Sequence, residues 1–182
     1  EKPAILDICA SHVSHFPEDV ASYAGRRVAL GMNEMELSQN KQVTEFVVKD
    51  LNEDPTLPFE DNSFDIVTNV VSIDYLTKPL EICKEVSRVL KPGGAAMFAL
   101  SNRCFPTKAV NIWLNTNDLE HVYVVGSYFH SGLNIWTTQK LEDTLAIDVT
   151  MLGKPYMLRI SHEGELPIAP LSDGVAVRGR QD

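Results

Sequence analysis

The sequence predicts an α/β fold with a doubly wound, mostly parallel sheet and helices on both faces. Short apolar segments alternate with helical stretches along the chain, which is the order that builds parallel strands through crossover helices. Those segments are almost continuously apolar, as expected for strands that are covered on both faces. The chain has 182 residues, 44% of them hydrophobic and 23% charged, which suits a single domain with a substantial core.

Five strands are predicted in the first hundred residues, at 4–9, 27–31, 43–49, 64–71 and 95–100. A short helix is expected at 17–24, with Pro17 in its first turn and Gly25 at its end. The clearest helix begins with Thr77 as its cap and Pro79 in its first turn. Its apolar stripe consists of Ile82, Cys83, Val86, Val89 and Leu90, and its water-facing residues are Glu81, Lys84, Glu85 and Arg88. The turn at 92–94 is expected to end this helix.

Beyond residue 100 the pattern predicts two helices and two final strands. The helices are expected at 106–114 and at 118–130, the second broken near Gly126, and the strands at 145–152 and 156–161. Residues 1–162 are therefore expected to form the α/β domain. Residues 163–182 hold few large apolar side chains and are expected to form a C-terminal tail.

The amino-acid composition limits the kinds of partner that we expect this protein to bind. The net charge of −9 disfavours binding to phosphate backbones, so no nucleic-acid partner is predicted. No apolar run approaches the length that crosses a bilayer. Three widely spaced cysteines do not form a disulfide framework, which favours a reducing compartment, the cytoplasm, although an organelle fits as well. No signal peptide is seen, and the sequence carries no signal for an oligomeric state.

Two motifs point to a family. Residues 57–67 read Leu-Pro-Phe-Glu-Asp-Asn-Ser-Phe-Asp-Ile-Val, and residues 85–94 read Glu-Val-Ser-Arg-Val-Leu-Lys-Pro-Gly-Gly. In this order and at this separation they resemble class I S-adenosylmethionine-dependent methyltransferases of the small-molecule type. The resemblance covers residues 4 to 105 and implies a Rossmann-like methyltransferase fold with S-adenosylmethionine as cofactor. The motifs themselves indicate fold rather than chemistry, so function must be argued from the site.

The resemblance also implies a cofactor site beyond the carboxyl ends of the strands. It assigns to this site Asp7, Cys9, Ala10, Ser11, Asn33, Asp50, Leu51, Asn69 and Val70. Cys9, Ser11 and Val13 stand where the family has glycine, and their Cβ atoms take up space and restrict positive φ. Asn33 stands where the family has a ribose-binding carboxylate, with Glu34 beside it as an alternative. Asp50 either contacts adenine or forms a turn with Asn52.

The part of the site that would hold the methyl acceptor is less well defined by the sequence. No motif fixes a base, and the candidate catalytic residues are Tyr75, Asp74 and His130. The aromatic residues after the fifth strand either wall an acceptor pocket or belong to the core or a dimer face. They are Trp113, Tyr123, Tyr128, Phe129 and Trp136. Cys9, His12 and His15 have a ligand-like spacing, but nothing nearby completes a four-ligand site, so no metal is predicted.

Two functions follow as hypotheses. The first is methyl transfer from S-adenosylmethionine to a small-molecule acceptor, and it depends on the paired motifs. The second is a catalytically inactive protein of the same fold that acts as a binding or assembly module, and the missing glycines motivate it. A nicotinamide-dependent enzyme is disfavoured because its glycine fingerprint is absent as well.

Overall fold

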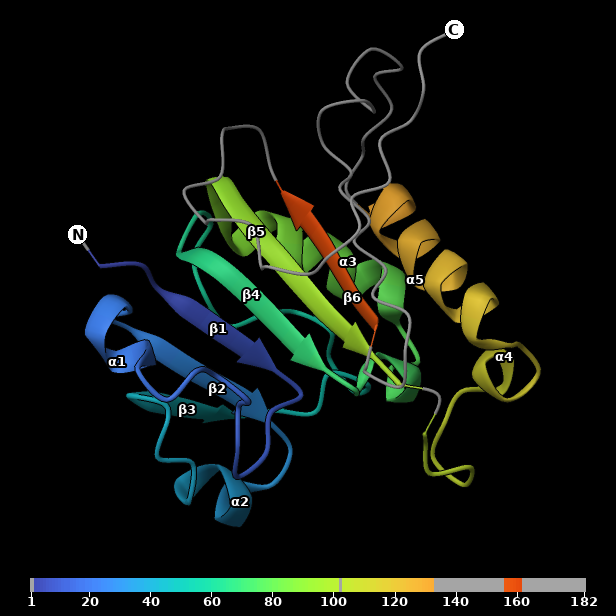
Figure 1. The fold of residues 1–182 in the computed structure, drawn as a ribbon, viewed down its shortest axis with the longest axis horizontal. Helices are drawn as coiled ribbons and strands as arrows, with labels where there is room; N and C mark the ends of the chain where they lie inside the picture. The colour runs from blue at the N-terminus through green and yellow to red at the C-terminus, as the bar shows by residue number, and fades with distance from the viewer. Residues whose placement is uncertain (1, 102, 133–155, 162–182) are drawn as a thin grey trace, which may run out of the picture.

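The computed structural model describes residues 2–101, 103–132 and 156–161. These residues contain a six-stranded sheet in the order β3-β2-β1-β4-β5-β6 (Figure 1). Strands β1 to β5 are parallel, and β6 pairs antiparallel with β5. The strand bounds are Ile5–Ile8 for β1, Arg27–Gly31 for β2, Glu45–Val48 for β3, Phe64–Val70 for β4, Leu90–Leu100 for β5 and Tyr156–Ser161 for β6. The doubly wound α/β class predicted from the sequence is confirmed.

The helices differ greatly in length. The longer ones are α3 at Pro79–Val89 and α5 at Asp118–Gly132, and the short ones are α1 at Val20–Tyr23, α2 at Glu34–Ser38, α4 at Asn111–Leu114 and the 3-10 turn η1 at Ile73–Tyr75. None of the helices in the described part of the chain is both long and apolar enough to cross a membrane.

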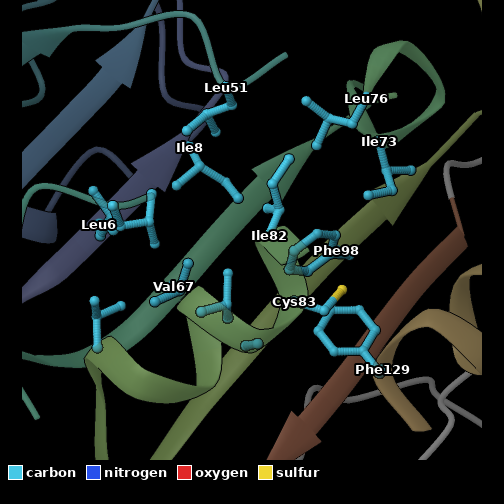
Figure 2. Close-up of a cluster of buried hydrophobic side chains, with 14 of the residues drawn as sticks. Leu6, Ile8, Leu51, Val67, Ile73, Leu76, Ile82, Cys83, Phe98 and Phe129 are labelled. Carbon is cyan, nitrogen blue, oxygen red and sulfur yellow. The ribbon is translucent and has the colours of Figure 1, made fainter. Parts of the chain in front are cut away.

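The main core lies between the sheet and α3, with α5 packed beside α3. Alternate residues of β1, Leu6 and Ile8, point to this side, where α3 contributes Ile82 and Cys83 to the same core. Figure 2 shows these side chains together with Phe98 of β5 and Phe129 of α5, whose rings meet edge to face at 4.6 Å between centroids. Such contacts anchor the strands from which the functional loops emerge.

The opposite face of the sheet has a thinner cover. The other set of strand residues includes Ile5 and Ile66, which pack against Val20 of the short α1 and Ala24 directly after it. Toward the β3 edge, Phe46 and Val48 are 38% and 47% exposed. Both faces are covered by helices, as predicted, but unequally, because the segment that connects β1 to β2 contains a single helical turn.

Arg88 explains why the two sequence motifs occur together. Its guanidinium donates to the carbonyl oxygens of Leu57 at 2.9 Å and Phe59 at 2.8 Å, both in the first motif. It also forms ion pairs with Glu85 at 2.6 Å and with Asp61 at 2.8 Å. One planar group with several donors thus ties the loop before β4 to the end of α3. We refer to this set of contacts as the Arg88 clamp.

The clamp corrects one prediction about α3. Glu85 and Arg88 were expected to face water, but their side chains are only 20% and 30% exposed because each has partners in the preceding loop. Thr77 was expected to cap the helix. Instead its hydroxyl and its N–H both donate to Asn52 Oδ1, and the cap position is Lys78, without a side-chain cap bond.

The turn at 92–94 also behaves differently from the prediction. Helix α3 ends at Val89, and β5 begins at once at Leu90, so Pro92-Gly93-Gly94 lies inside the strand. The register with β4 shifts between Phe64 and Ile66, which marks a bulge. Gly93 has a φ of 81°, which a residue with a side chain rarely adopts, and Pro92 has no N–H to donate to a neighbouring strand.

The later elements are partly as predicted. The helix expected at 106–114 is reduced to α4, and α5 continues through Gly126, at which a Cβ would meet nothing within 4 Å. The final strand, β6, matches its predicted range. The strand expected at 145–152 and the tail expected at 163–182 lie outside the described residues.

Candidate functional site

The predicted site residues gather where the parallel strands end. After β1 the chain turns toward β2 on one side, whereas β4 continues to β5 on the other, and β1 and β4 are direct neighbours. In open α/β sheets this reversal of strand order opens a crevice that binds ligands. Cys9 follows β1, and Asn69 and Val70 close β4, so these residues border that crevice.

The loop after β1 is held tightly against β2. The N–H of Ala10 donates to the carbonyl oxygen of Leu30 at 2.9 Å. A Cβ on Gly31 would lie 2.3 Å from the Ala10 carbonyl oxygen, so only glycine permits this approach. Cys9 has a φ of 58°, the left-handed conformation that glycine adopts most easily. The loop therefore keeps a glycine-like backbone at Cys9 although the glycine itself is absent.

The end of β4 is strained as well. Val71, the residue after β4, has a φ of 46°. Positive φ in a β-branched residue is a true outlier that costs roughly 1–3 kcal/mol. Its N–H donates to the carbonyl oxygen of Ala99 at 2.9 Å, which helps to hold this conformation. Strained residues thus flank the crevice on both sides, at Cys9 and Val71, and strain of this kind is common at functional sites.

Asp7 lies on β1 and is almost completely buried, at 2% exposure. Thr68 of β4 donates its hydroxyl to Asp7 Oδ1 at 2.8 Å. Burial raises the pKa of the Asp7 carboxyl to about 7, and the side chains of Ser14 and Thr68 oppose this shift. A group with this pKa changes charge near neutrality, and a cation placed beside it would favour the ionised form.

The Cys9 thiol is surrounded by acidic groups. Burial raises its pKa to about 12, and the charges of Asp7, Asp50 and Asp74 contribute to the shift. The thiol is therefore protonated near neutral pH and is not poised as a nucleophile. Acidic residues lie in β1 (Asp7), directly after β3 (Asp50) and in η1 (Asp74), so this end of the sheet favours a cationic ligand over an anionic one. Among the described residues, no three His, Cys, Asp or Glu side chains are grouped to hold a metal ion.

Two buried oxygen atoms near this point have no hydrogen-bond partner among the residues that the structure describes. Asn69 is fully buried and donates its Nδ2 to the Ile8 carbonyl oxygen at 3.2 Å, but its Oδ1 accepts nothing. Asp74 Oδ2 is also unpartnered, at 3% exposure of the residue. Burial raises the pKa of the Asp74 carboxyl. Because native proteins rarely leave such atoms unsatisfied, both oxygens are candidates for contact with a ligand or water.

The residues after β2 are engaged with one another and with the loop after β1. Asn33 caps α2: its Oδ1 accepts the Glu36 N–H at 3.3 Å, and its Nδ2 donates to Glu36 Oε1 at 2.9 Å. Glu34, the alternative carboxylate, is exposed. Glu36 is the carboxylate that reaches back to the loop after β1, where Ser11 Oγ donates to its Oε2 at 2.6 Å. Sequence reasoning missed both Glu36 and α2, although Asn33 followed by Glu36 has the spacing of a capping box.

After β3, the structure brings Asp50 and Leu51 to the same edge of the sheet. Asp50 Oδ1 accepts the Asn52 N–H at 2.8 Å, so the turn role considered for Asp50 is present. Leu51 is 3% exposed and belongs to the main core (Figure 2). Asn52 continues the connection by donating its Nδ2 to the carbonyl oxygen of Tyr75 at 3.0 Å. This bond links the loop after β3 to η1, on the acceptor side.

Two of the three candidate catalytic residues are neighbours in the structure. Asp74 and Tyr75 lie in η1, and the Tyr75 hydroxyl accepts the Phe105 N–H at 3.0 Å. Burial raises the pKa of Tyr75, which keeps the phenol protonated. His130 lies in α5. A buried residue of α5, His121, lowers the pKa of Asp74 by its electrostatic interaction, and its ring stacks on that of Trp113 with 3.8 Å between the centroids.

The aromatic residues after β5 have mixed roles. Trp113 and Phe129 are 4% and 1% exposed and belong to the core, and Tyr128 packs against it. Tyr123 is 79% exposed, and Trp136 lies outside the described residues. The core interpretation therefore accounts for three of these residues. The indole N–H of Trp113 is a third buried polar group without a partner.

These observations show how an S-adenosylmethionine molecule would fit. The three carboxyl groups around Cys9 suit its positive charges, and the free oxygens of Asn69 and Asp74 suit its donors. The side-chain oxygen of Asn33 accepts the Glu36 N–H as the cap of α2, and a contact of Asn33 with the ribose stays a prediction. A carboxylate is nevertheless present at this strand end, on Glu36. These residues therefore fit S-adenosylmethionine, although an asparagine stands where the family has its ribose-binding carboxylate.

Comparisons with known proteins agree with the fold and the motifs. Residues 9–98 match the family described as "Methyltransferase domain". A curated relative, malonyl-[acyl-carrier protein] O-methyltransferase of Marinomonas sp., is 26% identical over 126 residues, which are 63% of this chain and 47% of that protein. The ubiquinone/menaquinone biosynthesis C-methyltransferase UbiE of Ruegeria sp. is 51% identical over 41 residues, 22% of this chain and 16% of that protein. The chain thus spans less than half the length of these relatives.

Solved structures share the fold at low sequence identity. An S-adenosylmethionine-dependent methyltransferase from Aquifex aeolicus superposes with a TM-score of 0.58 at 14% identity, over 87% of this chain and 80% of that one. The [4+2]-cyclase SpnF superposes with a TM-score of 0.55 at 18% identity, over 72% and 51%. The second structure is described as a cyclase, so the fold alone does not fix the reaction. Residues 9–98 thus match the methyltransferase domain family, and the paired motifs and the sheet order agree with its class I S-adenosylmethionine-dependent members.

Proposed function

We propose that this protein binds S-adenosylmethionine in the crevice between β1 and β4 and transfers a methyl group to a small-molecule acceptor. The observation that carries the proposal is the pair of unpartnered buried oxygens, Asn69 Oδ1 in β4 and Asp74 Oδ2 in η1, beside strand ends that also carry the acidic residues Asp7 and Asp50. A cationic ligand is the kind of molecule that such a crevice attracts, and S-adenosylmethionine carries positive charge on its sulfonium and amino groups. When bound, it supplies a methyl group that is already activated for transfer.

The chain's own residues have distinct tasks in this proposal. Cys9, Ala10 and Ser11 form the loop under the ligand, and Asp7 is placed to ionise when a cation arrives beside it. Asn69 and Val70 end β4 on the other side of the crevice, where Asn69 Oδ1 is free to accept a donor. Alignment of donor and acceptor accounts for most of the barrier in a reaction of this type, so rigid strand ends matter more than a strong base.

On the acceptor side, Asp74 is the candidate base and Tyr75 a positioning residue. Asp74 Oδ2 has no partner, and its raised pKa brings its proton affinity closer to that of a useful base. The Tyr75 hydroxyl holds the Phe105 backbone and with it the loop after β5. His130 remains a candidate from the sequence alone. The acceptor is proposed as a small molecule because the motifs resemble the small-molecule branch of the family.

A second function is favoured by one observation. The Ser11 hydroxyl bonds to Glu36 across the edge of the crevice at 2.6 Å, and Cys9, Ser11 and Val13 fill positions where the family has glycine. A catalytically inactive domain of the same fold, used for binding or assembly, would tolerate such a closed edge. The two proposals differ in whether the nucleoside binds at all.

Isothermal titration calorimetry with S-adenosylmethionine and with S-adenosylhomocysteine tests the first proposal. We expect saturable binding, weakened about tenfold or more by Asp50→Asn, because this change removes a carboxylate that lies directly after β3 at the edge of the crevice. Glu53→Gln is the matched control, since Glu53 is exposed on the same loop and the charge change is identical. Absence of heat and of thermal stabilisation at millimolar ligand would overturn methyl transfer and leave the binding module. Release of S-adenosylhomocysteine with a cellular small-molecule fraction, absent with Asp74→Asn, would support turnover.

A further inference from the structure

The loop between β5 and α4 carries an exposed aromatic side chain between two basic ones. Phe105 is 66% exposed, and Arg103 and Lys108 are exposed on either side of it in the sequence. The Nζ atom of Lys108 lies 5.6 Å from the centroid of the Phe105 ring. In Figure 1 this loop and α4 project beyond the carboxyl end of β5. We refer to residues 103–108 as the Phe105 loop.

The two cations of the Phe105 loop are not neutralised by neighbouring side chains. In the described part of the chain, neither side chain forms an ion pair or donates a hydrogen bond. The lysines in the loops after β3 and β4 are engaged, because Lys49 pairs with Asp54 at 2.6 Å and Lys78 donates to the carbonyl oxygen of Glu53 at 2.8 Å. The chain as a whole has a net charge of −9, so two unpaired cations on one short loop make a local place for an anion.

The Phe105 loop is anchored to the residues proposed for the acceptor side. The Phe105 N–H donates to the Tyr75 hydroxyl at 3.0 Å, and the two rings lie 6.4 Å apart between centroids. The Phe105 carbonyl oxygen accepts the Lys108 N–H at 2.8 Å. Where the loop leads into α4, the Val110 N–H donates to the carbonyl oxygen of Asp74 at 2.8 Å. The loop backbone is therefore held beside η1, while its aromatic and basic side chains stay exposed.

Two buried polar atoms on the elements next to this loop need a partner. Asp74 Oδ2, in η1, and Trp113 Nε1, in α4, have no hydrogen-bond partner among the described residues, and the two residues are 3% and 4% exposed. The carboxyl oxygen can accept a hydroxyl group, and the indole N–H can donate to an oxygen. Because native proteins rarely leave such atoms unsatisfied, they indicate a ligand or water at this end of the molecule.

We propose that the Phe105 loop recognises the methyl acceptor, and that this acceptor is a soluble organic acid with an apolar or aromatic body. Arg103 and Lys108 hold the acid group, Phe105 contacts the body, and a hydroxyl group of the acceptor reaches Asp74. The inference rests on the proposed function, because it assumes that a methyl acceptor binds beside η1. Anionic lipids share this chemistry, but lipid surfaces are bound by clusters of about four to eight basic residues, whereas this loop has two.

A matched pair of fluorescent probes tests the recognition of an acid. The probe 8-anilinonaphthalene-1-sulfonate has an anionic group on an aromatic body, and N-phenyl-1-naphthylamine has the same rings without the charge. We expect Arg103→Gln/Lys108→Gln to bind the sulfonate about tenfold more weakly than the wild type, about threefold for each exposed cation, and the neutral probe equally well. Lys41→Gln/Lys84→Gln, which removes two exposed lysines elsewhere, should match the wild type with both probes.

Release of S-adenosylhomocysteine connects the loop to the acceptor. A cellular small-molecule extract is divided on an anion-exchange resin, and each fraction is supplied together with S-adenosylmethionine. We expect release with the retained, anionic fraction. Arg103→Gln/Lys108→Gln should need about tenfold more of this fraction for half-maximal rate, with a maximal rate within about twofold of the wild type, because it loses binding rather than chemistry. Arg103→Lys/Lys108→Arg keeps both charges and should restore the wild-type dependence.

The opposite results are equally defined. Absence of sulfonate binding by the wild type, or an equal effect of the double variant on both probes, overturns the anion site. Release with the unretained fraction alone, or with neither fraction, overturns the acid as acceptor. Sedimentation with phosphatidylglycerol vesicles that is lost in the double variant assigns the cations to a lipid surface instead. If the wild type shows no calorimetric binding of S-adenosylhomocysteine, the proposed function fails and the acceptor role falls with it, whereas such binding with unaltered variants refutes the inference alone.

Discussion

The Arg88 clamp makes a quantitative prediction about stability. Truncation by Arg88→Ala removes the donors to the carbonyl oxygens of Leu57 and Phe59 and the cation that faces Glu85. A hydrogen bond from a charged group contributes about 1.5–3 kcal/mol when shielded from water. The Arg88 side chain is 30% exposed, so water replaces part of this, and the pair with the 70% exposed Asp61 adds little. We expect a loss of about 2–4 kcal/mol in the free energy of unfolding.

Equilibrium unfolding in urea, followed by circular dichroism, measures this loss. Lys91→Ala is the matched control within the same motif, because Lys91 forms a single ion pair with Asp65 and is 39% exposed. The control should lose no more than about 1 kcal/mol. Arg88→Lys should fall between the two, since one ammonium cannot reach both carbonyl oxygens and both carboxylates. Equal losses in Arg88→Ala and Lys91→Ala would refute the idea that the paired motifs form one structural unit.

Three further predictions follow from single sites. Gly31→Ala should lower the free energy of unfolding by about 1–3 kcal/mol in urea titrations, because its Cβ would lie 2.3 Å from the Ala10 carbonyl oxygen; a loss below about 0.5 kcal/mol would contradict this. Burial raises the pKa of Asp7 to about 7, so the folded state holds its proton more firmly than the unfolded state does. The free energy of unfolding of the wild type relative to Asp7→Asn should therefore fall by roughly 2–4 kcal/mol between pH 4 and pH 7 and then level off. A flat difference across that range would argue against a buried neutral carboxyl. Tyr75→Phe removes the acceptor of the Phe105 N–H and should cost about 1 kcal/mol by thermal unfolding, with S-adenosylhomocysteine affinity unchanged if Tyr75 acts only through that loop.

The sheet could be predicted from the sequence because its strands are strongly apolar and bounded by turn residues. Residues 27–31 were predicted to the residue as β2, and 156–161 as β6. Helix α2 was not predicted, because its five residues bury a single side chain, Leu37, and form no apolar stripe. The Pro-Gly-Gly turn was misplaced because a bulge inside a strand and a helix stop use the same residues.

The site could be predicted only in part. The strand-end positions of Asp7, Asp50 and Asn69 follow from the motif order, and the structure brings them to one edge of the sheet. Side-chain direction does not follow from sequence. Asn33 turns to cap α2, and the third residue of that helix, Glu36, accepts a hydrogen bond from Ser11 in the loop after β1. A search for capping boxes after strand ends would have found it.

The thin cover near β3 has a consequence for handling the protein. In the described sheet, β3 has a partner on one side only, so its outer backbone groups are available to another strand. Phe46 and Val48 are exposed on this strand, with the charges of Glu45 and Lys49 at its two ends. Such charges act as gatekeepers against edge-to-edge self-association. Substitutions that neutralise them should promote concentration-dependent aggregation while the native fold is still intact, and light scattering would detect it.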